Sequence, residues 1–90
     1  DFIRPDYHVA LVSGALLQFK HGGSLEKIET RNGHIPAGII PFQIIDMVKQ
    51  YYPEAQITEY EIGKRSYEVK LSNGMELTFN SKFALIGIDD

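Results

Sequence analysis

Apolar and polar residues alternate strictly in two short stretches near the C-terminus. In residues 67–71 (Tyr-Glu-Val-Lys-Leu) and 75–79 (Met-Glu-Leu-Thr-Phe), every second side chain is apolar. A period of two indicates a β-strand with one buried face. The intervening Ser72-Asn73-Gly74 predicts a three-residue hairpin loop, with Gly74 in the left-handed conformation that a Cβ would oppose.

This loop length predicts the register of the hairpin. Three apolar pairs share one face: Tyr67 with Phe79, Val69 with Leu77, and Leu71 with Met75. On the other face Lys70 lies across from Glu76, which places opposite charges together. A two-residue loop would instead set Leu71 against Glu76 and break both patterns.

The same pattern occurs 60 residues earlier. Residues 7–30 align with residues 67–90 without a gap and share eight of 24 positions, where chance would give about one or two. The identical pairs are Tyr7/Tyr67, Val9/Val69, Leu11/Leu71, Gly14/Gly74, Leu17/Leu77, Phe19/Phe79, Leu25/Leu85 and Ile28/Ile88. We interpret this as a tandem repeat, with a further strand after each hairpin, near 24–29 and 83–88. Two unrelated hairpins with shared turn chemistry are the alternative.

One amphipathic helix is predicted within residues 35–55. Its apolar stripe has i+4 spacing and consists of Ile40, Ile44, Val48 and Tyr52. Ile45 and Met47 widen this stripe. Pro41 fits the first helical position, where no backbone N–H is needed, and Pro53 ends the helix after Tyr52. Gln43, Lys49 and Gln50 are expected on its exposed side.

The elements predict an α+β fold, an antiparallel β-sheet with one helix packed on one face. Residues 56–62 complete it as a strand, although Ile57 and Tyr60 break the alternation. The predicted division is a truncated first repeat at 1–30, a linker at 31–34 and a complete repeat at 35–90. Asp1 aligns with Glu61, so the first copy opens inside its first strand and lacks a helix.

The composition of the chain argues against several classes of function. Nine Lys+Arg against 12 Asp+Glu give a net charge of −3, which argues against a nucleic-acid partner. No apolar run approaches the roughly 20 residues of a membrane span. The chain has no Cys, hence no disulfide and no thiolate nucleophile. It begins with Asp and not Met, as expected for a processed exported chain or a fragment.

Candidate catalytic and metal-binding groups are few. His8, His21 and His34 lack metal-ligand spacing. Four glutamates are expected to point outward from the predicted strands, near Lys64, Arg65 and Lys70: Glu59, Glu61, Glu68 and Glu76. This arrangement is typical of a solvated, salt-bridged face and not of the paired carboxylates of a glycosidase. We therefore expect no catalytic residue, no metal site and no cofactor.

One surface is predicted to contact a partner. The outer face of the second copy is charged, whereas that of the first carries Ala10 and Leu16, and the inner face of the first has no helix of its own. Sheet surface that is apolar on both sides indicates an interaction site. The candidate partner-contact residues are Ala10, Leu16, Glu68, Lys70, Glu76 and Thr78.

Several motifs together resemble a known family. Pro-Ala-x-Ile at 36–39, Tyr-Pro-x-Ala at 52–55 and Tyr-Glu-Val-x-Leu-Ser-Asn-Gly at 67–74 resemble the PepSY-like, β-lactamase-inhibitor-like domains of exported Bacteroidetes proteins. The matching stretch is 35–90, and 7–30 resembles the tail of a preceding copy. The resemblance implies a periplasmic or secreted protein of tandem α/β units with a non-enzymatic binding or inhibitory role. It supplies no catalytic residue.

Three functions stay open at this point. The first is an extracytoplasmic module that binds or inhibits an unknown protein, the second a structural or self-associating module of the cell envelope, and the third a small enzyme or ligand carrier. A helix of about twelve residues spans only about 18 Å, too little to cover both hairpins. We therefore expect a homodimer, or exchange of an element between chains, to cover five side chains of the first copy: Tyr7, Val9, Leu11, Leu17 and Phe19.

Overall fold

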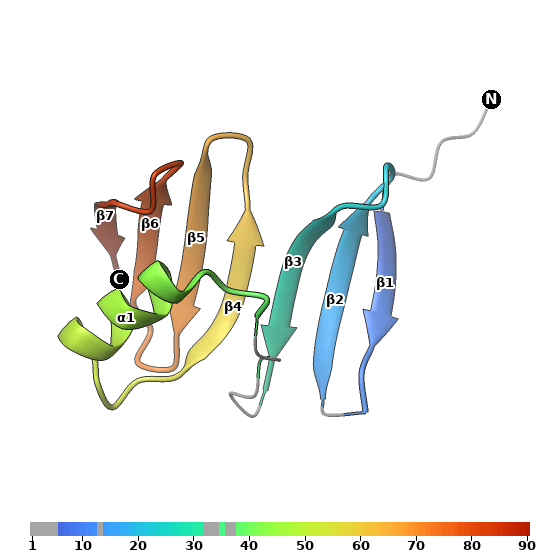
Figure 1. Cartoon of the computed structure of the whole chain (residues 1–90). Coiled ribbons are helices and arrows are strands. Elements are labelled where there is room, and N and C mark those ends of the chain that lie inside the picture. Colours follow the sequence, from blue (N-terminus) through green and yellow to red (C-terminus); the bar gives the residue numbers. More distant parts are fainter. Residues whose placement is uncertain (1–5, 13, 32–34, 36–37) are drawn as a thin grey trace.

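A computed structural model describes residues 6–12, 14–31, 35 and 38–90 of the chain. Within them, seven strands form one antiparallel sheet whose spatial order follows the chain order, and one helix, which comes between the third and fourth strands in the sequence, lies on one face of the sheet (Figure 1). The elements are β1 (Asp6–Ala10), β2 (Ala15–Lys20), β3 (Leu25–Thr30), α1 (Phe42–Tyr51), β4 (Ile57–Ile62), β5 (Ser66–Leu71), β6 (Glu76–Asn80) and β7 (Leu85–Asp89). The predicted α+β fold is confirmed.

The β5–β6 hairpin has the predicted register. Tyr67 pairs with Phe79 and Val69 with Leu77, and the Leu71 N–H donates to the Met75 carbonyl at 2.9 Å. Gly74 has φ +90°, so the three-residue loop is confirmed. The β1–β2 hairpin matches it 60 residues earlier, with Tyr7 opposite Phe19, Val9 opposite Leu17 and φ +96° at Gly14.

The helix begins one residue later than predicted. Pro41 caps it with extended ψ of 139°, and its carbonyl accepts the N–H groups of Ile44 and Ile45 at 3.1 and 3.3 Å. Pro41 therefore lies at the cap and not at the first helical position, because its carbonyl can begin the ladder while its own ψ stays extended. The buried residues are Ile44 and Val48, whereas Gln43, Lys49 and Gln50 are exposed as predicted. Ile45 and Tyr52 are half-buried.

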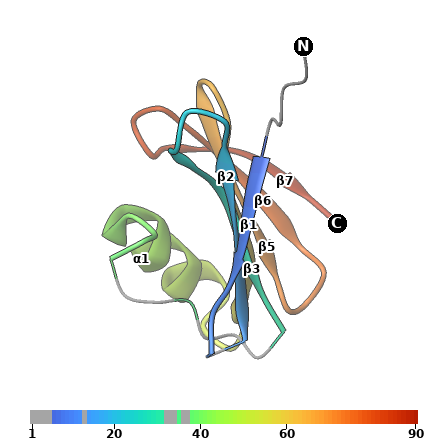
Figure 2. The same cartoon turned by 90° about the vertical axis from the view of Figure 1, so that its right-hand side faces the viewer.

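The sheet buries one face against the helix and leaves the other uncovered (Figure 2). One row of register partners crosses all seven strands on the helix side: Val9, Leu17, Ile28, Tyr60, Val69, Leu77 and Ile88. The middle of this row is buried, from Ile28 to Leu77, whereas Val9 and Ile88 on the edge strands are exposed. Helix α1 lies over the half of the sheet that contains β4–β7 and not over β1 and β2 (Figure 1).

Bulges explain the irregular positions along the strands. The register of β4 with β5 shifts between Ile57 and Glu59, which accounts for the broken alternation of residues 56–62, because a bulge residue adds one position to one strand. Two further shifts lie at Gln18/Phe19 and Thr78/Phe79, again 60 residues apart. Such equivalences are what a tandem repeat would produce. The repeat and its division at 1–30, 31–34 and 35–90 stay predictions, and residues 1–5 and 32–34 lie outside the described part of the chain.

Candidate partner-binding face

The face opposite the helix, here called the open face, carries two rows of register partners across the sheet. The first row consists of Ala10, Leu16, Glu29, Glu59, Lys70, Glu76 and Asp89. The second consists of His8, Gln18, Lys27, Glu61, Glu68, Thr78 and Gly87. Side chains of a strand alternate between the faces, so both rows lie opposite the buried Ile28–Tyr60–Val69 row.

All six predicted contact residues lie on the open face. Ala10, Leu16, Lys70 and Glu76 belong to the first row, and Glu68 and Thr78 to the second. They do not form one tight cluster, because Ala10 and Leu16 lie on β1 and β2 while the other four lie on β5 and β6. Strands β3 and β4 lie between the two groups.

The open face is more negative than the chain as a whole. Its two rows contain six carboxylates and two lysines, a net charge of −4, against −3 for all 90 residues. Glu61 lies directly opposite Glu68. Like charges directly across a sheet destabilise it, and Lys27, the register partner of Glu61 on the other side, offsets part of this repulsion.

Glu59 is a largely enclosed carboxylate of the first row, with 15% of its side chain exposed. Its nearest cation is Lys70, whose Nζ lies 3.8 Å from Oε2. Burial raises the pKa of Glu59, with Glu29 and Glu61 acting in the same direction and Lys70 and Lys27 opposing them. Lys70 lies across from Glu76 as predicted, but it approaches Glu59, while Lys64 and Arg65 lie in the exposed β4–β5 turn.

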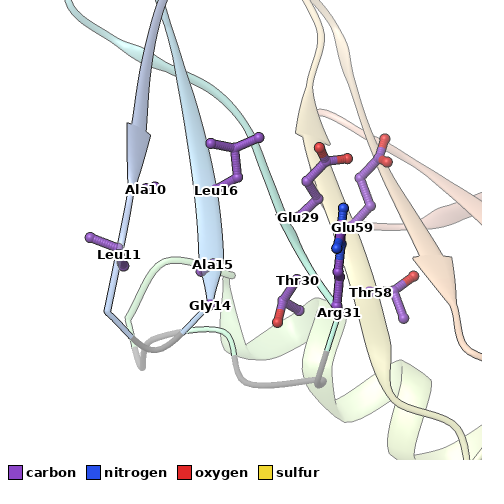
Figure 3. Close-up of a pocket in the computed structure, with 10 residues that line it drawn as sticks. All are labelled: Ala10, Leu11, Gly14, Ala15, Leu16, Glu29, Thr30, Arg31, Thr58 and Glu59. Atoms are coloured by element: carbon purple, nitrogen blue, oxygen red, sulfur yellow. The ribbon is translucent and has the colours of Figure 1, made fainter.

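A hollow of about 680 Å³ lies where β3 and β4 part (Figure 3). Their pairing runs only as far as Glu29 and Glu59. Beyond that point Thr30 pairs with Ala15 of β2, and Ile57 pairs with Leu71 of β5. The lining has an apolar side from the β1–β2 hairpin (Ala10, Leu11, Gly14, Ala15 and Leu16) and a polar side from β3 and β4 (Glu29, Thr30, Arg31, Thr58 and Glu59).

Sequence reasoning placed Glu59 on a solvated face and did not single out Glu29, Arg31 or Thr58. The alternation around Ile28 could have placed Lys27 and Glu29 on the open face. The hollow itself had no signal in the sequence, because β3 and β4 are separated along the chain by the helix.

The two histidines that the structure describes, His8 and His21, are not brought together. His8 is exposed on the open face with its Nε2 3.2 Å from the Gln18 Oε1, His21 is exposed in a turn, and His34 lies outside the described residues. Among the residues that the structure describes, no three His, Asp or Glu side chains are grouped so that they could hold a metal ion. Within the same part of the chain, no helix is long and apolar enough to cross a membrane.

Comparison with known proteins identifies the family. A family model described as "Putative beta-lactamase-inhibitor-like, PepSY-like" matches residues 5–87. The chain belongs to this PepSY-like family. The predicted resemblance is thereby confirmed, and it extends beyond 35–90 into the first hairpin. A search of curated proteins finds no match.

Solved structures of Bacteroides proteins share the fold over nearly the whole chain. A "putative calcium-regulated periplasmic protein" from Bacteroides thetaiotaomicron is 39% identical with a TM-score of 0.87, over 100% of this chain and 71% of the other. A "putative periplasmic protein" from Bacteroides vulgatus is 34% identical with a TM-score of 0.82, over 94% of this chain and 67% of the other. Another, from the same species, is 28% identical with a TM-score of 0.83, over 94% and 68%.

These relatives agree with the predicted location. All three are described as periplasmic, so the extracytoplasmic location expected from the sequence is confirmed. The family is described as inhibitor-like and not as catalytic.

Proposed function

We propose that this PepSY-like chain is a non-enzymatic binding or inhibitor-type module that contacts a protein partner with its open face. The observation that carries the proposal is the arrangement of the six candidate contact residues on the one sheet face that the helix leaves uncovered: Ala10, Leu16, Glu68, Lys70, Glu76 and Thr78. An antiparallel sheet with a helix on only one side presents a broad uncovered surface, which suits recognition of another folded protein.

The Glu61–Glu68 pair supports the same proposal. Two carboxylates directly across from one another cost stability in the free protein. A partner that brings positive charge to this part of the face relieves that repulsion on binding. The pair therefore favours positively charged partners over neutral or negative ones.

A charge reversal tests the proposal. The purified chain is immobilised and exposed to a Bacteroides periplasmic extract, and the captured protein is then purified and its affinity measured against variants. Glu68→Lys, which introduces an opposite charge across from Glu61, should weaken binding at least about tenfold. The matched control Glu54→Lys makes the same change in the exposed turn after the helix and should bind like the wild type.

The charge reversal also separates binding from folding. Glu68→Lys should unfold at the same or higher urea concentration than the wild type, because it replaces a repulsive pair by an attractive one. If no protein is captured, or if the captured protein binds Glu68→Lys as well as wild type, the open face is not the contact surface.

A second candidate function is self-association through the β1–β2 hairpin. It is favoured by the incomplete cover of the first hairpin on the helix side, where Val9 is 44% exposed. A second copy of the chain could cover this surface, and the oligomeric state in solution tests the idea.

A further inference from the structure

We infer that the hollow between β3 and β4 is an anchoring site for one cationic side chain, lysine or arginine, of the partner protein. The inference rests on the proposed function for its biological meaning, but the site itself can be tested alone. It is carried by a cavity whose two sides differ in chemistry.

The apolar side suits the stem of a long basic side chain. Ala10, Leu11 and Leu16 line it from the β1–β2 hairpin. Lysine and arginine carry three or four methylene groups that pack on apolar surface while the charged head reaches a polar group. The volume of about 680 Å³ lies within the range of ligand pockets and leaves room for the adjoining peptide backbone.

The polar side suits the charged head. Glu29 and Glu59 are register partners on adjacent strands, and Figure 3 shows their carboxylates on the same side of the sheet at the rim of the hollow. Two adjacent carboxylates can accept several N–H donors from one guanidinium or ammonium group. The Thr58 hydroxyl lies on the same side of the lining.

The resident cations Lys70 and Lys27 act on Glu59 but do not offset the effect of its burial. Lys70 lies 3.8 Å from Glu59, longer than a hydrogen bond, and its side chain is 45% exposed. Arg31 also lines the hollow but is exposed, and it is not among the charges that act on the Glu59 carboxyl. Burial raises the pKa of Glu59 because it removes water from the carboxylate. A cation placed beside such a carboxylate stabilises its charged form.

Other occupants fit less well. A free anion would meet two carboxylates against one guanidinium. A bare metal ion would find two carboxylates, whereas the described residues contain no group of three His, Asp or Glu able to hold one.

Nuclear magnetic resonance with small probes tests the site. The ¹⁵N-labelled chain is titrated with N-acetyl-arginine amide, and then with the neutral analogues N-acetyl-citrulline amide and N-acetyl-norleucine amide. We expect saturable millimolar binding of the arginine probe with the largest shifts at Leu16, Glu29, Thr58 and Glu59. Both neutral probes should bind on the order of tenfold more weakly or not at all, because each lacks the charge.

Two isosteric variants locate the effect. Glu59→Gln should weaken arginine binding on the order of tenfold, whereas Glu54→Gln makes the same charge change in the exposed turn after the helix, away from the hollow, and should leave binding unchanged. The spectra themselves report whether each variant is folded. Absence of saturable shifts, shifts centred on Glu61 and Glu68, or equal losses in both variants would overturn the inference.

The partner experiment remains separate from this one. Failure of the arginine probe removes the anchoring site but leaves capture of a protein by the open face intact. If instead the open face proves not to contact a partner but the arginine probe binds, the hollow is a cation-binding site whose partner is not assigned.

Discussion

Val9 and Val69 occupy equivalent positions 60 residues apart, yet Val9 is 44% exposed and Val69 is fully buried. Both lie on the helix side of the sheet, in the same row of register partners. The difference arises because α1 lies over the half of the sheet that contains β4–β7 and leaves β1 and β2 without cover (Figure 1). The first hairpin thus exposes apolar surface at positions that are buried in the core in the second hairpin.

Self-association should follow from this exposure. We expect light scattering at micromolar concentration to give a mass of about 20 kDa, twice the 10.2 kDa of the chain, because burying an apolar side chain contributes about 1.5–3 kcal/mol. Val9→Ser should shift the equilibrium toward monomer. Ile86→Ser, at an exposed apolar position of the opposite edge strand β7, is the matched control and should not. A monomeric wild-type chain would contradict the prediction.

Gly74 should not tolerate a β-branched residue. Its φ of +90° is the cause, since open space surrounds the position where a Cβ would lie. Gly74→Val should lower the free energy of unfolding by about 1 kcal/mol or more, measured by urea denaturation. Gly22→Val is the control, because Gly22 also faces open space and lacks a positive φ. Equal losses in the two variants would mean that backbone conformation is not the reason.

The helix should be held to the sheet mainly by Ile44. Its side chain is fully buried in the cluster that also contains Val48, Tyr60 and Leu77. Ile44→Ala should destabilise the fold by about 2–4 kcal/mol, because it loses transfer free energy and leaves a cavity. Gln43→Ala, the exposed neighbour, should change the free energy of unfolding by less than about 0.5 kcal/mol. A comparable loss in both variants would show that the helix does not pack through this stripe.

Alkaline pH should destabilise the fold through Tyr60. Burial raises the pKa of Tyr60 to about 12, with Tyr67 adding to the shift, and the two rings stack with centroids 6.2 Å apart. The folded state holds this proton more tightly than the unfolded chain. Its contribution is therefore complete below the unfolded pKa of about 10 and is lost as the pH rises toward 12.

Urea unfolding between pH 9 and 12 measures this contribution. The wild type should lose on the order of 2 kcal/mol over that range from Tyr60 alone, and Tyr60→Phe should lose correspondingly less. An ultraviolet titration in which every tyrosine of the folded chain ionises near pH 10 would contradict the prediction.

Local chemistry made the hairpins predictable. Alternation on either side of Gly14 and Gly74 leaves one register that keeps apolar residues together, and the structure has that register in both hairpins. The predicted start of the helix differs from the observed start by one residue, because a proline is compatible with both the cap and the first turn.

The open face was predictable only in part. The bulge near Thr58 hides the parity of β4 in the sequence, so the alignment of Glu29, Glu59 and Lys70 in one row could not be inferred. The hollow depends on where β3 and β4 part. That point is set by packing between distant segments, for which the local pattern carries no information.

The agreement between strand order and chain order has a consequence for folding kinetics. Each strand pairs with its neighbours in the sequence, and only the β3–β4 pair must close a long loop, the one that contains α1. Chains dominated by such local pairings close small loops first and fold fast for their size. We expect the units β1–β3 and β4–β7 to form early and independently. The barrier would then be the joining of β3 to β4 as α1 settles on the sheet, and substitutions at Ile28 or Tyr60, which meet at that seam, should slow refolding more than substitutions in either outer hairpin.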